Sequence, residues 1–78
     1  MREVYVQGLR ERGYQQTGGG AVKLFVRQTT DVCYIVQIIE QEVSVQQLKQ
    51  IRETVAAAYR SRTDAEIRQM TVFYMQNS

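Results

Sequence analysis

The residues AVKLFVRQTTDVCYIVQIIE (21–40) decide the fold of this chain. In the first half apolar and polar positions alternate, and Val22, Leu24 and Val26 point to the same face of an extended strand. The second half is apolar on both faces, which is typical of a strand in the interior of a sheet that helices cover. The polar residues 29–31 between the two halves are a natural turn. We therefore predict a β-hairpin.

A short helix is predicted before the hairpin. Residues 2–12 place apolar side chains three and four positions apart, as on one side of a helix. Gly13 follows, and a glycine just beyond a helix readily adopts the left-handed conformation that ends it. In such a Schellman ending Tyr14 would contact Leu9.

A second helix and a third strand are predicted after the hairpin. Ser44 has a glutamine three residues later, Gln47, and this pair has the capping-box pattern of a helix start. The helical periodicity continues to about Arg60. Residues 67–76 follow as a strand that is apolar on both faces.

These elements predict one small α+β domain over residues 1–78, in the order α-β-β-α-β, with a three-stranded sheet. The third strand can pair with the second, which gives a mixed sheet, or with the first, which gives an antiparallel one. The sequence leaves both arrangements open. We expect both helices on one face of the sheet, so that the other face stays apolar and uncovered. In a small domain such a face indicates a partner, a second copy or a missing part of the chain.

The three consecutive glycines 18–20 resemble part of a phosphate-binding loop. Both common loops of that kind need a strand before the glycines and a helix after them, so that the helix N-terminus faces the phosphate. Here the predicted order is helix, glycines, strand. We therefore interpret the glycines as a loose connection and not as a phosphate site.

The chain lacks the residues of the common reaction centres. It contains no histidine, which is the commonest general base and a frequent zinc ligand. The single cysteine, Cys33, alternates with large apolar residues, and this pattern favours a small buried side chain over a reactive thiol. Carboxylates such as Asp31, Glu40 and Asp64 fall at turns and at the ends of elements. We expect no enzymatic activity, no cofactor and no metal site.

The best candidate for a binding surface is the side of the first strand that carries Lys23, Phe25 and Arg27. Two cations around an aromatic ring can bind the backbone of a single-stranded nucleic acid and stack one of its bases. A net charge of +2 gives this hypothesis little general support. We keep a small nucleic-acid-binding module as the alternative function and rank it below a protein-binding role.

The chain resembles the soluble N-terminal region of some rhomboid-like membrane proteins of Firmicutes. The resemblance rests on LFVRQTTDVCYIVQII (24–39), on a helix opening SVQQLKQI (44–51), on the strand MTVFYMQ (70–76) and on a short first helix that ends in Gly-Tyr. It implies a cytosolic accessory domain that precedes a membrane-embedded part. The serine and histidine of that family would lie in the membrane part, so no functional residue is carried over to this chain.

The hypothesis that follows is a non-catalytic interaction or regulatory domain, in the cytoplasm, whose contact with a membrane is by tethering only. With one cysteine the chain cannot form an internal disulfide, and it has neither an apolar run of about 20 residues nor a secretion signal pattern. The sequence stops soon after an apolar run, so a fragment of a longer chain is an alternative. The partner would be a protein or a second copy, bound at the open sheet face or at an edge strand.

Overall fold

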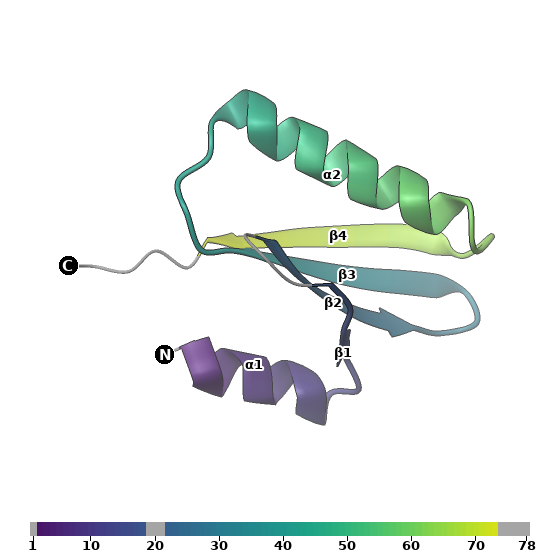
Figure 1. Ribbon diagram of the computed structural model, residues 1–78. Helices are drawn as coiled ribbons and strands as arrows, with labels where there is room; N and C mark the ends of the chain where they lie inside the picture. Colours follow the sequence, from purple (N-terminus) through teal and green to yellow (C-terminus); the bar gives the residue numbers. More distant parts are fainter. Residues whose placement is uncertain (1, 19–21, 74–78) are drawn as a thin grey trace.

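The protein is an α+β domain with two helices and a four-stranded mixed sheet (Figure 1). A computed structural model describes residues 2–18 and 22–73. The elements are α1 (Arg2–Glu11), β1 (Gln15–Gln16), β2 (Val22–Gln28), β3 (Val32–Ile39), α2 (Val45–Arg60) and β4 (Glu66–Phe73). The spatial order of the strands is β1-β2-β3-β4; β2 is antiparallel to both β1 and β3, and β4 is parallel to β3.

The predicted hairpin is confirmed, and the sheet is the mixed one of the two arrangements that the sequence left open. In the turn between β2 and β3, the Thr29 backbone N–H donates to the Val32 carbonyl over 2.8 Å. Because β4 pairs with β3 and not with β2, β3 is an interior strand with neighbours on both sides. Its burial follows, since every residue from Ile35 to Ile39 is buried.

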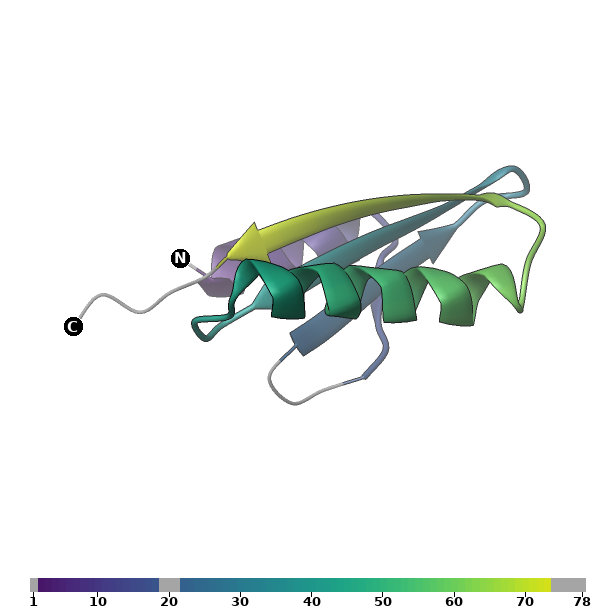
Figure 2. The ribbon, with the colours of Figure 1, turned by 90° about the horizontal axis from the view of Figure 1, so that it is seen from above.

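The expectation of both helices on one face is wrong. α2 lies on one face of the sheet and α1 on the other (Figure 1), and the view from above shows α2 in front of the strands and α1 behind them (Figure 2). The physical reason lies in β3, which is apolar on both faces. Val36 and Ile38 need cover on one side, and Ile35 and Ile39 need it on the other.

The hydrophobic core under α1 joins this helix to three strands. Leu9 of α1 packs with Phe25 of β2 and with Val36 and Ile38 of β3. These four side chains are at most 5% exposed. Further apolar residues that pack against them in part are Tyr5, Val6, Tyr14 and Val72.

The end of α1 has the predicted geometry. Gly13 has a φ of 91°, in the left-handed region. Its N–H donates to the Arg10 carbonyl, and the Tyr14 N–H donates to the Leu9 carbonyl, both over 3.0 Å. This pair of hydrogen bonds defines the Schellman motif and turns the chain back toward the sheet.

The prediction of three strands is wrong by one, because β1 was missed. β1 has only two residues, both glutamines, and pairs Gln15 with Val26 and Gln16 with Phe25. No periodicity can be recognised in two residues. Of the three glycines, Gly18 has a φ of 94°, whereas residues 19 and 20 lie outside the described part.

The start of α2 is also as predicted. The Ser44 hydroxyl accepts from the Gln47 N–H over 3.1 Å, and the Gln47 side chain accepts from the Ser44 N–H over 2.9 Å. The helix ends at Arg60, and the last strand begins at Glu66. Residues 74–76 of the predicted strand 67–76 lie outside the described residues. Neither described helix is long and apolar enough to cross a membrane.

Candidate interaction surface along β4

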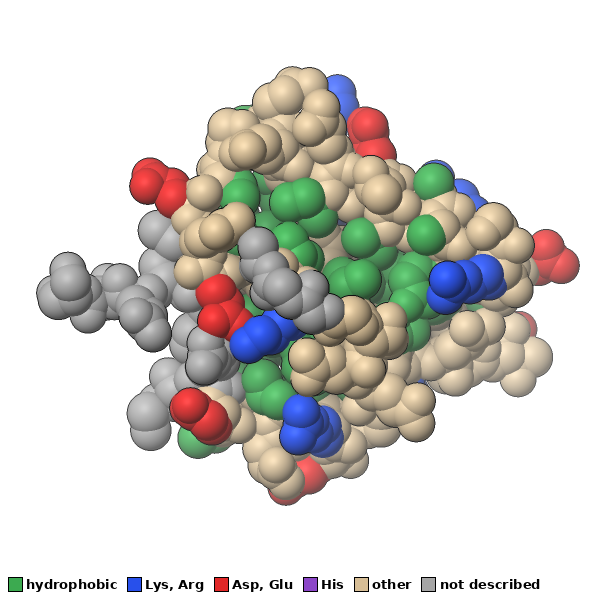
Figure 3. Space-filling view, in the orientation of Figure 1, with side chains coloured by type: hydrophobic (Ala, Val, Ile, Leu, Met, Phe, Trp, Pro, Cys, Tyr) green, Lys and Arg blue, Asp and Glu red, His purple; other side chains and the backbone are tan. Residues whose placement is uncertain are grey.

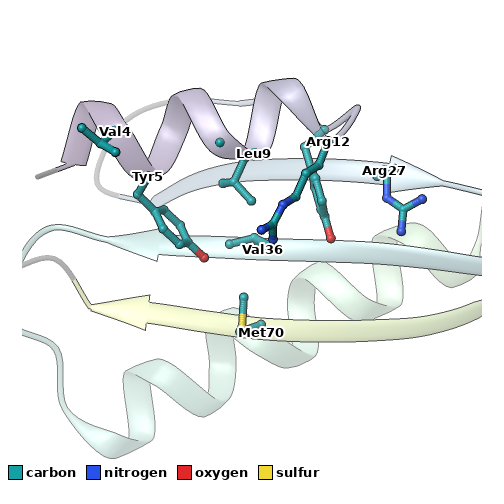
Figure 4. A pocket seen from close by; sticks show the side chains of 9 residues that line it. Val4, Tyr5, Leu9, Arg12, Arg27, Val36 and Met70 are labelled. Atoms are coloured by element: carbon teal, nitrogen blue, oxygen red, sulfur yellow. The ribbon is translucent and has the colours of Figure 1, made fainter.

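A groove lies between α1 and β4 on the face of the sheet that α1 covers (Figure 4). We call it the α1–β4 groove; its volume is about 550 Å³. The residues that line it are Val4, Tyr5, Gly8, Leu9, Arg12, Tyr14, Arg27, Val36 and Met70. Because α1 leaves the face of β4 uncovered at Met70, this strip of the sheet is open to a partner.

The flank of α1 forms one wall of the groove. Val4, Gly8 and Arg12 lie four residues apart, so they line up along one side of the helix. Val4 is 65% exposed, so this wall presents an apolar side chain to solvent. A Cβ atom on Gly8 would meet no atom within 4 Å, so the chain itself gives no steric reason for a glycine there.

The floor of the groove is apolar. The register places Phe25, Val36 and Met70 in one row across β2, β3 and β4. Phe25 and Val36 are buried under α1, whereas Met70 is 50% exposed. The apolar row therefore extends from the core out to the open strand.

The next row across the sheet is basic and aromatic. Arg27 lies opposite Tyr34, and Tyr34 lies opposite Arg68. The Arg27 guanidinium carbon is 4.5 Å from the centroid of the Tyr34 ring and 5.7 Å from that of Tyr14, which are cation–π distances. Arg27 is thus held by two rings, and its charge stays available to an anion.

Among the described residues that line the α1–β4 groove there is no carboxylate, although both Arg12 and Arg27 line it. The ion pairs found among the described residues are those of Lys23 with Glu40 and of Arg68 with Glu66. The hydrogen bond from Arg68 to Glu66, together with the attraction between their charges, raises the pKa of this arginine. The groove therefore carries positive charge without an acidic neighbour among the residues that line it.

The predicted surface of Lys23, Phe25 and Arg27 is divided by the fold. Phe25 is fully buried, so the expectation of an exposed ring is wrong. The Lys23 ammonium lies 2.7 Å from Glu40 Oε1. Arg27 is the one member of the three that reaches the α1–β4 groove. The reason is that α1 covers this side of β2, which the sequence did not reveal.

β4 is also an edge strand. It has eight residues, and in the described part of the chain it pairs with β3 alone. Glu66 and Arg68 lie at its beginning, whereas Met70 and Phe73, each 50% exposed, lie further along. A regular edge of this length offers unpaired backbone groups to a further strand.

A second groove lies on the opposite face, between α2 and β2. It has a volume of about 460 Å³, and its apolar lining includes Val22, Leu24 and Ile51. Figure 3 shows hydrophobic side chains gathered below α2 on this side of the molecule. The polar residues that line it in the described part of the chain are glutamines and a threonine, without a charged residue among them. It offers a partner apolar contact without any charge selection.

Polar side chains, one fully buried and three partly buried, lie beneath α2. Gln69 Nε2 donates to Gln37 Oε1 over 2.9 Å and to the Arg52 carbonyl over 3.1 Å. Arg52 in turn donates to the Thr71 hydroxyl over 2.7 Å. Gln37 is fully buried, and its Nε2 has no hydrogen-bond partner in the described structure. These residues tie α2 to β3 and β4, and we call them the amide network.

In the part of the chain that the structure describes, the side chains with reactive chemistry do not come together. Cys33 is fully buried in β3, and burial raises the pKa of its thiol, which disfavours the nucleophilic thiolate. Among residues 2–18 and 22–73, no three or more cysteine or carboxylate side chains are close enough to hold a metal ion. The α1–β4 groove and the β4 edge are therefore the surface with the most specific chemistry.

Comparison with protein-family models, with curated proteins and with solved structures finds no match for this chain.

Proposed function

We propose that this chain is a non-catalytic interaction domain that binds a protein along β4. The observation that carries the proposal is the exposure of β4, an eight-residue edge strand with a half-exposed Met70 on the face that α1 leaves open. Edge backbone groups and an adjacent apolar strip are what a protein partner can use, because hydrogen bonds add to apolar burial.

The chemistry of the surface favours a protein over a nucleic acid. The apolar row that ends at Met70 offers contact area to apolar side chains. The ring that would stack a base, Phe25, is fully buried, so stacking on it would require α1 to leave the sheet. We therefore do not put forward the nucleic-acid alternative.

The proposed setting is the cytosol, as an accessory domain of a larger membrane protein. The resemblance to the N-terminal region of rhomboid-like proteins supports it. The test is the coding sequence that follows Ser78. Several apolar segments of about 20 residues directly after this position would support tethering, and their absence would contradict it.

Site-specific photocrosslinking in the producing organism tests the interaction. Benzoylphenylalanine replaces Met70, which is half exposed, and in a control it replaces Gln46, which is exposed on α2. We expect covalent protein adducts from position 70 and few from position 46. An adduct of twice the monomer mass identifies a second copy as the partner. Equal labelling from the two positions, or none from position 70, contradicts the proposed function.

A further inference from the structure

We propose that the α1–β4 groove binds an amphipathic helix with acidic residues in its first turn, and that this helix lies antiparallel to α1. The inference rests on the proposed function, because it names the partner of the same surface. Three observations support it: the shape of the α1 flank, the open floor at β4 and the positive charge of Arg12 and Arg27.

The space beside α1 suits a helix. α1 occupies one side of this sheet face, and Val36 and Met70 form the floor of the strip next to it (Figure 4). Helices that pack side by side lie about 8–10 Å apart and pack rows of side chains four residues apart against one another. Val4, Gly8 and Arg12 are such a row. A partner helix there would complete the helical layer on this face.

The packing within the chain gives no reason for a glycine at position 8. A glycine inside a helix is unfavourable compared with alanine, and here a Cβ would meet nothing within 4 Å. On the flank that faces the groove, its missing side chain leaves a depression between Val4 and Arg12. A side chain of a neighbouring helix fits such a depression and brings the two backbones close together.

The apolar part of the partner follows from the exposed side chains. Val4 is 65% exposed on the wall, and Met70 is 50% exposed on the floor. One apolar stripe on a helix in the groove would cover both residues. The opposite side of that helix would face water and be polar, so the partner is amphipathic.

The charge and the direction of the partner follow from the arginines. Arg12 lies just beyond the C-terminal end of α1, and Arg27 lies on β2 close to the same end of the groove. Acidic side chains stabilise the N-terminal turn of a helix through its dipole. A helix that begins at this end can place its acidic first turn at Arg12 and Arg27, and it then runs antiparallel to α1.

An extended segment at the β4 edge is the competing occupant. It would lie beside β4 on the edge away from β3, contact Met70 from there and gain backbone hydrogen bonds along β4. It would not need the depression at Gly8 on the α1 flank. Variants of Gly8 and Arg12 therefore separate the two occupants.

The experiment is a display selection against the purified domain. The library holds peptides of about 16 residues with one apolar helical stripe and random residues elsewhere, a length that spans about 24 Å as a helix. We expect the selected peptides to carry Asp or Glu in the first turn and to become helical on binding, as measured by circular dichroism. Synthetic copies are then titrated into the domain by fluorescence anisotropy.

Two variants test the contacts. Arg12→Gln should weaken the selected peptides at least tenfold, whereas Lys49→Gln, which removes an exposed charge on α2, should leave the affinity unchanged. Gly8→Ala should weaken them at least threefold and at the same time raise the urea midpoint of the free domain, because the added methyl group meets open space. A loss of binding through misfolding would lower that midpoint instead.

Some results overturn the inference. They are a selection without binders, binders that lack acidic residues, binders that stay extended, and affinities that do not respond to Arg12→Gln and Gly8→Ala. If crosslinks from position 70 persist in any of these cases, the proposed function stands without the helical partner. If those crosslinks are absent but acidic helices bind as expected, the proposed function fails and the chemistry of the groove is confirmed.

Discussion

The two faces of one sheet differ in the contacts that they make with their helices. Under α1, Leu9 packs on Phe25, Val36 and Ile38 in an apolar cluster. Under α2, Gln69 bonds both Gln37 and the backbone of the helix. Apolar contact is tolerant of direction, whereas hydrogen bonds fix the register of the groups that make them. The difference indicates that polar contacts to the sheet help to position α2, whereas the packing of α1 on β2 and β3 rests mainly on apolar burial.

A difference in length between the two helices explains where the open surface lies. α1 is a helix of 10 residues and α2 one of 16 residues, so the shorter helix leaves more of its sheet face uncovered. The apolar row that begins at Phe25 therefore continues into the α1–β4 groove at Met70. Four predictions, from the largest expected effect to the smallest, test this comparison.

The largest effect is expected on the α1 face. Phe25→Ala removes a fully buried ring and should lower the free energy of unfolding by about 3–5 kcal/mol. A domain of this size has a net stability of only about 3–5 kcal/mol, so the variant should be largely unfolded by circular dichroism. Phe73→Ala, at a half-exposed position, is the control and should cost about 1 kcal/mol. A folded Phe25→Ala variant of normal stability would contradict the apolar cluster.

The next effect is expected in the amide network. Gln69→Met removes the donor to the buried Gln37 Oε1, and this unsatisfied group should cost about 1–3 kcal/mol in urea unfolding. Gln37→Met should be nearly neutral, because it also removes an Nε2 group without a partner. In the double variant the loss should be smaller than in Gln69→Met alone. Losses that simply add would mean that the two amides do not interact.

A smaller effect is expected at the end of α1. Gly13→Ala places a Cβ on a residue with a φ of 91° and should cost about 1–2 kcal/mol. Gly8→Ala is the matched control, because Gly8 is helical and has room for a methyl group. The two alanine variants should change the urea midpoint in opposite directions. If both variants lower the urea midpoint, the conclusion that a methyl group fits at Gly8 is wrong.

The smallest effect concerns the pH dependence of stability through Cys33. Burial raises the pKa of its thiol in the folded state, so the unfolded chain loses the thiol proton first as the pH rises. The contribution of Cys33 is therefore complete below the pKa of the unfolded thiol and declines above about pH 8.5. We expect the free energy of unfolding to fall as the pH rises above about 8.5, and to fall less in Cys33→Ala. The same slope in both proteins would show that Cys33 does not contribute.

The local signals in the sequence predicted the elements well. The alternation in residues 22–28, the capping box at Ser44 and the Gly13 ending all describe contacts between near neighbours in the chain. β1 carried no such signal, because two glutamines show no periodicity and their pairing with β2 depends on the chain reversal after α1. For the candidate site, Arg27 alone was predicted, while Gly8, Arg12 and Met70 were not. Their shared groove is made by elements that lie far apart in the sequence.

The sequence by itself determined the α+β class, the hairpin and the ends of both helices, because these depend on periodicity and on hydrogen bonds within a few residues. The tertiary structure decided the pairing of β4 with β3 and the placement of α1 opposite α2. It also decided that Phe25 is buried and that Met70 is exposed. These outcomes depend on which apolar faces meet across the whole chain, and β3, which is apolar on both sides, is satisfied only when each of its faces is covered.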